Sequence, residues 1–581
     1  MHGQRRHARP GGEPSAAARP AGAQPALRPG PGLRELGRLA VPEIGNKVNK
    51  LNKAISGTIF LFVFAVYAYT AYPTIAPRDS ADLAAAALTA RPAHPPGYAF
   101  YVLLGRAWLT LVPWGDAAFR LNLMASAAGA GAATGVFLLL SRCCGFWPGL
   151  GAALALALSL PLWKFSLLCE MYSLQALFLS VLLLLAPGPD DVPSSVSLRA
   201  ALSALLFGLG LVNHQALILA GPGLAVLWWE DLRRKNFWRL CFPLVALGLG
   251  LNLFLWVRTG SGPQAWAMVT RQEYGTWQLS AGLSRPWSAS LALDLLRHFA
   301  VELGRGTSWL VVLLGLFGAV ELRRCPRFAG GLAISVAGLG PVFFLMTRFD
   351  VSGWVARTVL ESALVAPTVV LCVAAGFGLA WVARRWAPAA AILATAIAVM
   401  GCWRHGSEAY HRDDFSAYDY VKDLRRALPP GSVAVAAGDT ALYGTRYLDL
   451  TRPDGSGRKF IDSQDPVPAE KPGYVFGLPL DEVERLGWGR AKDMNPAGLV
   501  QTWARTKADA FWDVSVLRPG RALRRAESYA RDVLLSYAFA HYLSGQLLEA
   551  GGDLSHKAGW HYMRAAALDP EDYQIEYNET R

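Results

Sequence analysis

The chain has 581 residues, of which 53% are hydrophobic and 17% are charged, and its formal net charge is +13. This composition excludes an ordinary soluble protein, because it is too apolar and too poor in charged residues. The positive charge does not indicate nucleic-acid binding, since the basic residues gather at the ends of apolar segments and form no basic-aromatic surface. We therefore expect a polytopic membrane protein.

The first 54 residues form a segment of their own. Residues 1–54 are rich in Gly, Pro, Ala and Arg and carry no hydrophobic pattern that could form a core. We expect a disordered basic tail, and its layout is not that of a cleavable signal peptide. Lys47, Lys50 and Lys53 precede the first apolar run, which predicts a cytoplasmic N-terminus.

Residues 55–403 carry repeated apolar runs, each of roughly the length that crosses a bilayer. A further segment, residues 98–112, has the aromatic pattern of a helix lying on the outer interface. Basic residues concentrate on the inner side of the resulting topology, which supports it independently of hydropathy. The runs predict about eleven transmembrane helices, at residues 58–75, 117–140, 147–163, 174–186, 198–212, 216–229, 238–257, 304–320, 328–346, 359–382 and 389–402.

Polar residues gather on the outer side. The loop after the first span holds Asp79 and Asp82, which share one face of a helix, and His94 just before a Pro-Pro-Gly turn. For each residue alone a structural role is commoner, since Asp79 can cap the helix and His94 can fill the turn. Ionisable groups at membrane level nevertheless usually mark a substrate site or pathway. The other outer-side residues are Glu170, Tyr172, Asn213, His214, Arg271, Glu273, Tyr274, Arg348 and Asp350.

Beyond residue 403 the composition is that of a soluble domain. Residues 404–520 predict an extracytoplasmic α/β domain with strands at 432–437 and 474–476. Gly438-Asp439 after the first strand is not a nucleotide-binding fingerprint. Residues 521–581 predict a helical segment like one tetratricopeptide repeat, which must pack on the rest of the domain. All seven cysteines precede residue 403, so this domain contains no disulfide, and no ligand spacing predicts a metal site.

Several blocks of the sequence resemble one family in the same order. Arg78-Asp79-Ser80-Ala81-Asp82-Leu83 and Ala93-His94-Pro95-Pro96-Gly97-Tyr98 are similar to the D-S-G-E-L and A-H-P-P-G-Y signatures of a polytopic glycosyltransferase family of type C fold. That family includes the protein O-mannosyltransferase transmembrane protein 260. The chain departs from the signature where Ala81 replaces Gly and Asp82 replaces Glu. Further similar blocks lie at residues 120–123, 170–174, 210–214, 271–275 and 414–439.

The resemblance implies a helical membrane enzyme whose active site faces the outer side and whose donor sugar is carried on a polyprenyl phosphate. The acids Asp79 and Asp82 are then the catalytic candidates, with Asp79 as the base that takes a proton from the acceptor hydroxyl. Arg271 and Arg348 are the cations that would hold the lipid phosphate, with His94 or His214 in a lesser role. The scheme uses no cofactor and leaves a divalent metal undetermined. The remaining substrate-site candidates are Glu170, Tyr172, Asn213, Glu273 and Tyr274.

We expect an inverting O-mannosyltransferase that modifies protein Ser or Thr, with a glycan or lipid acceptor as the alternative. Two other classes stay open, a transporter or flippase of a lipid-linked glycan and a non-enzymatic scaffold. A transporter predicts repeated halves, and the sequence has no visible internal symmetry. The composition favours a bacterial inner membrane with the C-terminal domain in the periplasm, or the endoplasmic reticulum membrane in a eukaryote. The oligomeric state is not indicated.

Overall fold

The computed structural model describes residues 42–188, 198–275, 283–462, 472–504, 509–521, 531–551 and 556–569. The chain divides into two compact units, Met1–Ala54 and Ile55–Arg581. In the first unit the described residues are the beginning of helix α2 (Pro42–Thr70). All other described residues belong to the second unit.

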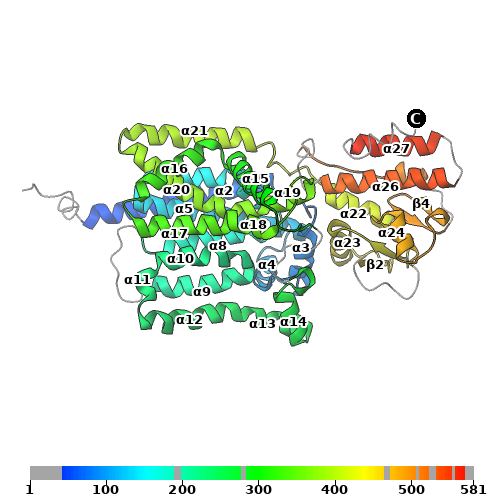
Figure 1. Ribbon diagram of the computed structural model, residues 1–581, viewed down its shortest axis with the longest axis horizontal. Coiled ribbons are helices and arrows are strands. Elements are labelled where there is room, and N and C mark those ends of the chain that lie inside the picture. The colour runs from blue at the N-terminus through cyan, green and yellow to red at the C-terminus, as the bar shows by residue number, and fades with distance from the viewer. Residues whose placement is uncertain are drawn as a thin grey trace, which may run out of the picture. The chain divides into compact units, whose positions relative to one another are not determined.

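Helices build the second unit as far as residue 405 (Figure 1). The first of them are α3 (Ser80–Thr89), α4 (Ala99–Leu111), α5 (Ala117–Cys144), α6 (Phe146–Ala157), α7 (Leu160–Phe165), α8 (Tyr172–Leu185), α9 (Leu198–Asn213), η1 (Gln215–Ala220), α10 (Gly221–Leu227), α11 (Trp229–Leu232) and α12 (Lys235–Leu249). They continue with η2 (Gly250–Asn252), α13 (Leu253–Thr259), α14 (Gly262–Val269), η3 (Gln272–Tyr274), α15 (Ala289–Thr307), α16 (Trp309–Leu322), α17 (Pro326–Ala337), η4 (Gly338–Val342), α18 (Phe343–Thr347), α19 (Trp354–Glu361), η5 (Ser362–Leu364), α20 (Val365–Ala383) and α21 (Ala387–His405).

Within the described residues, five helical stretches are long and apolar enough to cross a membrane, and a bent pair makes a sixth if it counts as one span. Shorter apolar helices of 10–17 residues occupy five of the other expected positions. The number eleven therefore stays a prediction. Prolines and short 3-10 segments break several apolar runs, for example at Pro161 in α7 and at η1 after α9. The long stretches are Ala117–Cys144, Lys235–Thr259, Pro326–Thr347, Trp354–Ala383 and Ala387–His405.

The run expected to span at residues 304–320 is not one straight helix. The chain bends by 105° between α15 and α16, so the apolar helix begins at Trp309 and α15 runs in another direction. Ser308 at the bend has a positive φ of 81° and its side chain accepts a hydrogen bond from the Leu310 amide. This local N-cap starts a new helix inside what hydropathy reads as one segment.

Small residues let the membrane helices pack closely. In the contact between α16 and α20, a Cβ on Gly318 would collide with the Ala374 carbonyl oxygen. A Cβ on Gly378 would likewise collide with the Leu314 carbonyl oxygen. Close backbone approach of this kind is the usual basis of helix association in lipid, where there is no hydrophobic driving force between helices.

The described residues from 406 onward form the part that we expect on the extracytoplasmic side, and we call it the outer domain for that expectation. It is built on a five-stranded mixed sheet with the order β2-β1-β3-β5-β4. Strand β1 pairs in parallel with β2 and β3, and Ala434 lies opposite Tyr474, while β5 pairs antiparallel with β3 and β4. Strands β1 and β3 occupy the two segments expected as strands. The strands are β1 (Val433–Ala436), β2 (Lys459–Asp462), β3 (Tyr474–Phe476), β4 (Asn495–Ala497) and β5 (Val500–Thr502).

The helices of the outer domain surround this sheet. The last two pack on each other, since Gly545 of α26 leaves no room for a side chain beside Tyr562 of α27. Helix α26 also packs on α22, where Tyr537 donates a hydrogen bond of 2.8 Å to Asp423. The helices are α22 (Ser416–Ala427), α23 (Asp439–Thr451), α24 (Leu480–Arg485), η6 (Ala491–Asp493), α25 (Asp509–Trp512), α26 (Arg531–Ala550) and α27 (His556–Leu568).

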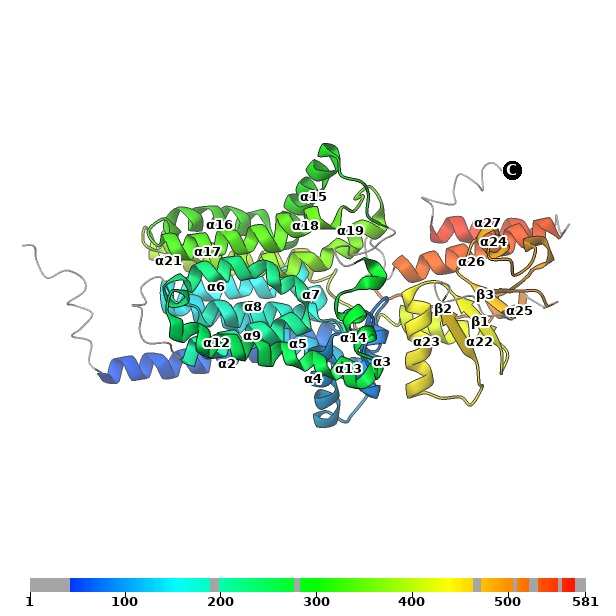
Figure 2. The same cartoon turned by 60° about the horizontal axis from the view of Figure 1, so that its bottom comes forward.

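The outer domain rests on the membrane helices through α23, which lies beside α3 (Figure 2). The Tyr447 hydroxyl donates to the Asp116 carboxylate at 2.9 Å and accepts from the Ala118 amide at 3.0 Å, at the start of α5. The Arg78 amide donates to the Thr440 hydroxyl at 2.8 Å. The Thr440 contact thus brings the first turn of α23 to the start of α3, and the Tyr447 contacts bring the C-terminal part of α23 to the start of α5.

Candidate active site

A cavity of about 380 Å³ lies where α3 meets the outer domain. Its walls come from the ends of membrane helices and from α23 and α26. Polar and charged side chains converge on it from segments far apart in the sequence. Among the described residues, those of this kind are Arg78, Asp79, His94, Tyr98, Glu170, Tyr172, Gln175, His214, Arg271, Tyr274, Ser362, Asp439, Tyr443 and Asp532.

Asp79 sits at the N-terminus of α3, an alanine-rich and largely buried helix. Its carboxylate makes no capping hydrogen bond with α3 and instead faces the cavity, with 33% of the side chain exposed. The Ser80 hydroxyl accepts a hydrogen bond from the Ala76 amide and thereby ties down the loop before the helix. The Asp79 side chain therefore faces the cavity and makes no capping hydrogen bond to the backbone amides of α3.

His94 lies between the two acids of the first loop. Its Nδ1 is 2.9 Å from Asp82 Oδ2, which also accepts the His94 backbone amide at 2.8 Å. Its Nε2 is 3.6 Å from Asp79 Oδ2. A turn holds the imidazole there, since the Gly97 amide donates to the His94 carbonyl oxygen and Gly97 has a positive φ of 85° that suits glycine.

Asp82 is placed differently from Asp79. It is buried, with 3% exposure, and it is not among the described residues that line the cavity. Its carboxylate is used to orient His94. The sequence-based expectation that Asp82 is a second catalytic acid therefore becomes a proposal that it positions His94.

The charge on His94 follows from these neighbours. Burial disfavours the imidazolium, but the carboxylates of Asp79, Asp82 and Glu170 raise the pKa of His94 to about 9. At neutral pH the ring is then charged, and both of its nitrogens carry a proton. The Asp79 carboxylate thus lies beside a fixed positive charge.

Glu170 and His214 occupy the membrane side of the cavity. Burial and the Asp79 carboxylate raise the pKa of Glu170 well above its usual range, and its Oε2 has no hydrogen-bond partner in the described part of the chain. Burial and the charge of Arg271 lower the pKa of His214 to about 3, so its ring is neutral and packs against Tyr172 with the ring centroids 5.2 Å apart. The lowered pKa does not favour His214 as a cation for the lipid phosphate, and that role stays a prediction.

Two arginines face the cavity, Arg78 and Arg271. Arg78, Tyr98 and Arg271 have positive φ angles of 68°, 43° and 55°. This left-handed conformation is costly for a residue with a side chain, and such strain clusters at functional sites. The Arg271 guanidinium lies 5.1 Å from the centroid of the Tyr274 ring, and both residues line the cavity.

Besides Asp82, three expected site residues lie away from the cavity lining that the structure describes. Asn213 is buried and its side-chain amide donates to the Met171 carbonyl oxygen at 3.1 Å, which fixes the start of α8. Glu273 is exposed to solvent. Arg348 ends α18 in a left-handed conformation, and its carbonyl oxygen accepts the Arg285 amide.

The outer domain adds acids that sequence reasoning did not select. Asp439 follows β1 directly after Gly438, whose φ of 100° turns the chain into α23. Burial and the Asp79 carboxylate raise the pKa of Asp439 to about 7. The signal was available, because ligands bind beyond the carboxyl ends of parallel strands. Asp532 on α26 also lines the cavity, and no local sequence pattern points to it.

A metal site is a separate question. In the part of the chain that the structure describes, no three His, Cys, Asp or Glu side chains are grouped closely enough to hold a metal ion. The carboxylates that line the cavity come from separate segments of the chain, and Arg78 and Arg271 lie in the same lining. The arrangement suits proton transfer at Asp79 and binding of an anionic group at Arg78 and Arg271.

Comparison with known proteins supports the resemblance found in the sequence. Residues 79–237 match the family model described as the Protein O-mannosyl-transferase TMEM260 N-terminal domain. The chain is 25% identical over 448 residues to Protein O-mannosyl-transferase TMEM260 of Mus musculus, covering 69% of this chain and 62% of that protein. It is 23% identical over 457 residues to Protein O-mannosyl-transferase tmem260 of Dictyostelium discoideum, covering 68% of this chain and 56% of that protein. The chain thus spans somewhat more than half the length of these relatives.

The fold resembles that of solved type C membrane glycosyltransferases. The crystal structure of ArnT from Cupriavidus metallidurans bound to undecaprenyl phosphate aligns with a TM-score of 0.50 and 13% identity, covering 78% of this chain and 98% of that one. The oligosaccharyltransferase of Archaeoglobus fulgidus aligns with a TM-score of 0.43 and 13% identity, over 70% of this chain and 62% of that one. The mostly helical fold and the apolar helices indicate an integral membrane protein.

Proposed function

We propose that this chain is a glycosyltransferase that moves a sugar from a polyprenyl-phosphate carrier to an acceptor hydroxyl on the extracytoplasmic face of a membrane. One observation carries the proposal. Asp79, where the match to the family model begins, points into a cavity between apolar helices and a soluble domain. Mannose as the sugar and protein Ser or Thr as the acceptor are supported by the names of the two relatives.

Asp79 is the general base in this proposal. Its carboxylate accepts the proton of the acceptor hydroxyl while the hydroxyl oxygen forms a bond to the anomeric carbon of the sugar. The bond between that carbon and the phosphate oxygen breaks, and the configuration at the carbon inverts. General-base catalysis of this kind typically contributes about 10²–10⁴-fold to the rate.

The neighbours of Asp79 tune the base. The His94 imidazolium lies 3.6 Å from the Asp79 carboxylate and places a positive charge beside the proposed base. Asp82 holds His94 in that place through both the ring and the backbone amide. His94 and Asp82 are therefore proposed as positioning residues that act through Asp79.

The leaving group is a phosphate, and the cavity offers Arg78 and Arg271 to hold it. Guanidinium groups match phosphate oxygens in charge and in bidentate geometry. Glu170 and Asp439, whose pKa values are raised, can keep a proton and donate hydrogen bonds to sugar hydroxyls. The structurally similar ArnT binds undecaprenyl phosphate in its crystal structure, which supports a lipid carrier of this class here.

The charge pattern supports an outward-facing cavity. Ala366, near the start of α20, lines the cavity, and Arg384 and Arg385 follow the other end of this helix. Phe343 at the start of α18 lines it too, whereas Arg327 lies at the beginning of α17. Basic residues favour the cytoplasmic side, so the cavity is placed on the opposite side, in the periplasm or the endoplasmic reticulum lumen.

The test is sugar transfer by the full chain in detergent from radiolabelled polyprenyl-phosphate mannose to peptides that contain Ser and Thr. Wild type is expected to transfer label, and Asp79→Asn is expected to lose most of the activity. Asp294→Asn is the matched control, because Asp294 is exposed on α15 and is not among the lining residues. Equal transfer by wild type and Asp79→Asn would refute the assignment of the base.

A further inference from the structure

The outer domain carries a second polar hollow, of about 240 Å³, that the proposed reaction does not use. It lies between α22, the end of α23 and the loop that leads to β2. Five cations and one acid line it. They are Lys422, Arg425, Arg426, Arg452, Arg458 and Asp454, and we call this set the basic groove.

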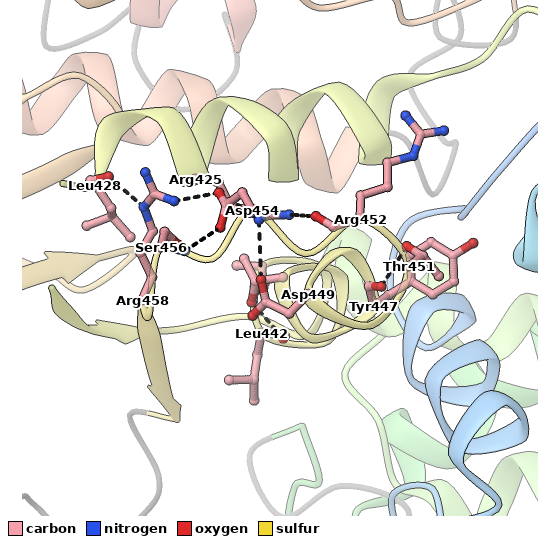
Figure 3. A network of polar contacts seen from close by, with 12 residues as sticks. Arg425, Leu428, Leu442, Tyr447, Asp449, Thr451, Arg452, Asp454, Ser456 and Arg458 are labelled. Atoms are coloured by element: carbon pink, nitrogen blue, oxygen red, sulfur yellow. Dashed lines mark hydrogen bonds and ion pairs between the residues drawn. The ribbon is translucent and has the colours of Figure 1, made fainter. Parts of the chain in front are cut away.

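Two arginines of the basic groove are held in place before any ligand arrives. Arg425 and Arg458 converge on Asp454, at 2.8 Å and 2.7 Å (Figure 3). Arg458 Nε also donates to the Leu428 carbonyl oxygen at 2.7 Å, and Arg425 Nη1 donates to the Arg452 carbonyl oxygen at 3.2 Å. Their side chains are only 13% and 9% exposed. One exposed carboxylate thus bridges two ordered guanidinium groups.

The remaining cations leave an excess of positive charge at the mouth. In the described part of the chain, Lys422 and Arg452 are exposed and pair with no carboxylate. The Arg452 guanidinium instead lies 5.0 Å from the Tyr418 ring centroid and hydrogen-bonds its hydroxyl. Arg426 is 3.4 Å from Asp423, a buried acid that already accepts from Tyr537. The groove is therefore suited to an anion with several oxygen acceptors.

The basic groove is connected to the membrane surface by two routes. Tyr447, about one turn before Arg452 on α23, bonds to Asp116, which caps the membrane-spanning helix α5. In the segment just before Asp116, the Trp114 side chain is 76% exposed. Tryptophans at the ends of spans typically sit among lipid headgroups. In addition, α22 begins shortly after α21, which is a candidate span.

We propose that the basic groove binds the phosphate of an anionic phospholipid headgroup at the membrane surface. Guanidinium forks fit phosphate oxygens, and Asp454 occupies that place when lipid is absent. Asp454 is exposed, and a bound phosphate would replace its carboxylate at the two arginines while the Ser456 amide keeps its 3.0 Å hydrogen bond to Asp454. Arg425 also lies 3.6 Å from Asp449, which stays its partner when the phosphate binds. Occupation would hold the end of α23 against the membrane. Its other end carries Asp439, so the lipid contact would also steady the wall of the candidate active site.

The experiment measures thermal unfolding of the full chain in neutral detergent while short-chain lipids are titrated in. The probes are dihexanoyl phosphatidylglycerol, dihexanoyl phosphatidylcholine and inorganic phosphate. The test variant is Lys422→Gln with Arg452→Gln. The matched control is Arg446→Gln with Lys459→Gln, because these two cations are exposed in the same domain but do not line the groove.

Phosphatidylglycerol is expected to raise the melting temperature of wild type and of the control variant, and phosphatidylcholine is not. The test variant should need at least about tenfold more phosphatidylglycerol for half the shift, as expected when two phosphate contacts are lost. If the double variant does not fold, Lys422→Gln alone should show a smaller increase. The same titration curve for wild type and variant, or no specific shift in wild type, would overturn the proposal. An equal shift with inorganic phosphate would overturn the assignment to a lipid.

Discussion

At the scale of single residues, the site depends on how His94 is shared between two acids. Asp82 fixes one side of the imidazole at 2.9 Å and is shielded from the cavity, while Asp79 meets the other side and stays open to it. Asp79 and Asp82 are the same residue type three positions apart, and the difference in their burial is why we propose different roles for them. Of the two acids, Asp79 alone is among the described residues that line the cavity, which is why we propose it and not Asp82 as the base.

The pH dependence of the melting temperature should reveal the positive charge on His94. Because the folded-state pKa of about 9 exceeds the ordinary value of 6.5, its ion pairs stabilise fully below about pH 6.5, and this stabilisation is lost as the pH rises through 9. We expect His94→Gln to lower the melting temperature most below pH 6.5 and least above pH 9. The shift corresponds to about 3 kcal/mol at most. His556→Gln, at an exposed position on α27, is the control in the same thermal scan. A deficit that does not change with pH would contradict the assigned charge.

Asp439 should also make the stability of the folded chain depend on pH. Its pKa of about 7 lies above the ordinary 3.8, because burial and the Asp79 carboxylate disfavour its ionised form. Folding is therefore penalised as the pH rises from about 4 to 7. We expect Asp439→Asn to gain melting temperature over wild type across that range and to keep the gain above pH 7. An advantage that is already complete at pH 4 would show that a different interaction is responsible.

Much of the site could be predicted from the first 275 residues. Asp79, His94 and Arg271 face the cavity, as do Glu170, Tyr172, His214 and Tyr274. These residues sit in short blocks at the ends of apolar runs, and the topology expected from hydropathy groups them on one side of the membrane. Asp439 and Asp532 were not predicted as site residues, because they reach the cavity only through the packing of the outer domain on α3. Burial keeps Asp82 out of the cavity lining and lowers the pKa of His214, and the burial of these two side chains could not be predicted from the sequence.

At the scale of elements, backbone contact between helices decides the packing. Helices α16 and α20 approach at Gly318 and Gly378, where each glycine lies against a carbonyl oxygen of the other helix. Such approach replaces the hydrophobic force that is absent in lipid. Hydropathy located most apolar runs but could not predict the 105° bend at Ser308. A single polar N-cap residue inside an apolar run hardly changes the mean hydropathy of that run.

The close contact predicts a severe effect of a single methyl group. Gly318→Ala would place a Cβ against the Ala374 carbonyl oxygen, and backbone cannot move away as a side chain can. We expect a loss of about 1–3 kcal/mol or more, seen as a lower melting temperature and a smaller monodisperse yield in detergent. Gly57→Ala is the matched control, since nothing lies within 4 Å of its Cβ position. Equal behaviour of the two variants would refute the close approach of α16 and α20.

At the scale of the whole molecule, the catalytic proposal joins two parts that composition separates. Asp79, His94 and Arg271 lie in the loops that connect the helices of the apolar part, and the soluble domain adds Asp439 to the cavity lining. The fold resembles ArnT at a TM-score of 0.50, whereas the proposal for mannose and protein acceptors rests on relatives of which this chain spans 62% and 56%. The chemistry must therefore be tested on this chain itself.

The most direct measurement is a single-turnover transfer rate, with donor affinity measured on the same preparation, for wild type and Asp79→Asn. If Asp79 is the base, the variant binds polyprenyl-phosphate mannose with unchanged affinity and transfers it about 10²–10⁴-fold more slowly. A transfer rate within a few-fold of wild type, with the donor bound normally, would contradict the central claim that the carboxylate facing the cavity removes the acceptor proton.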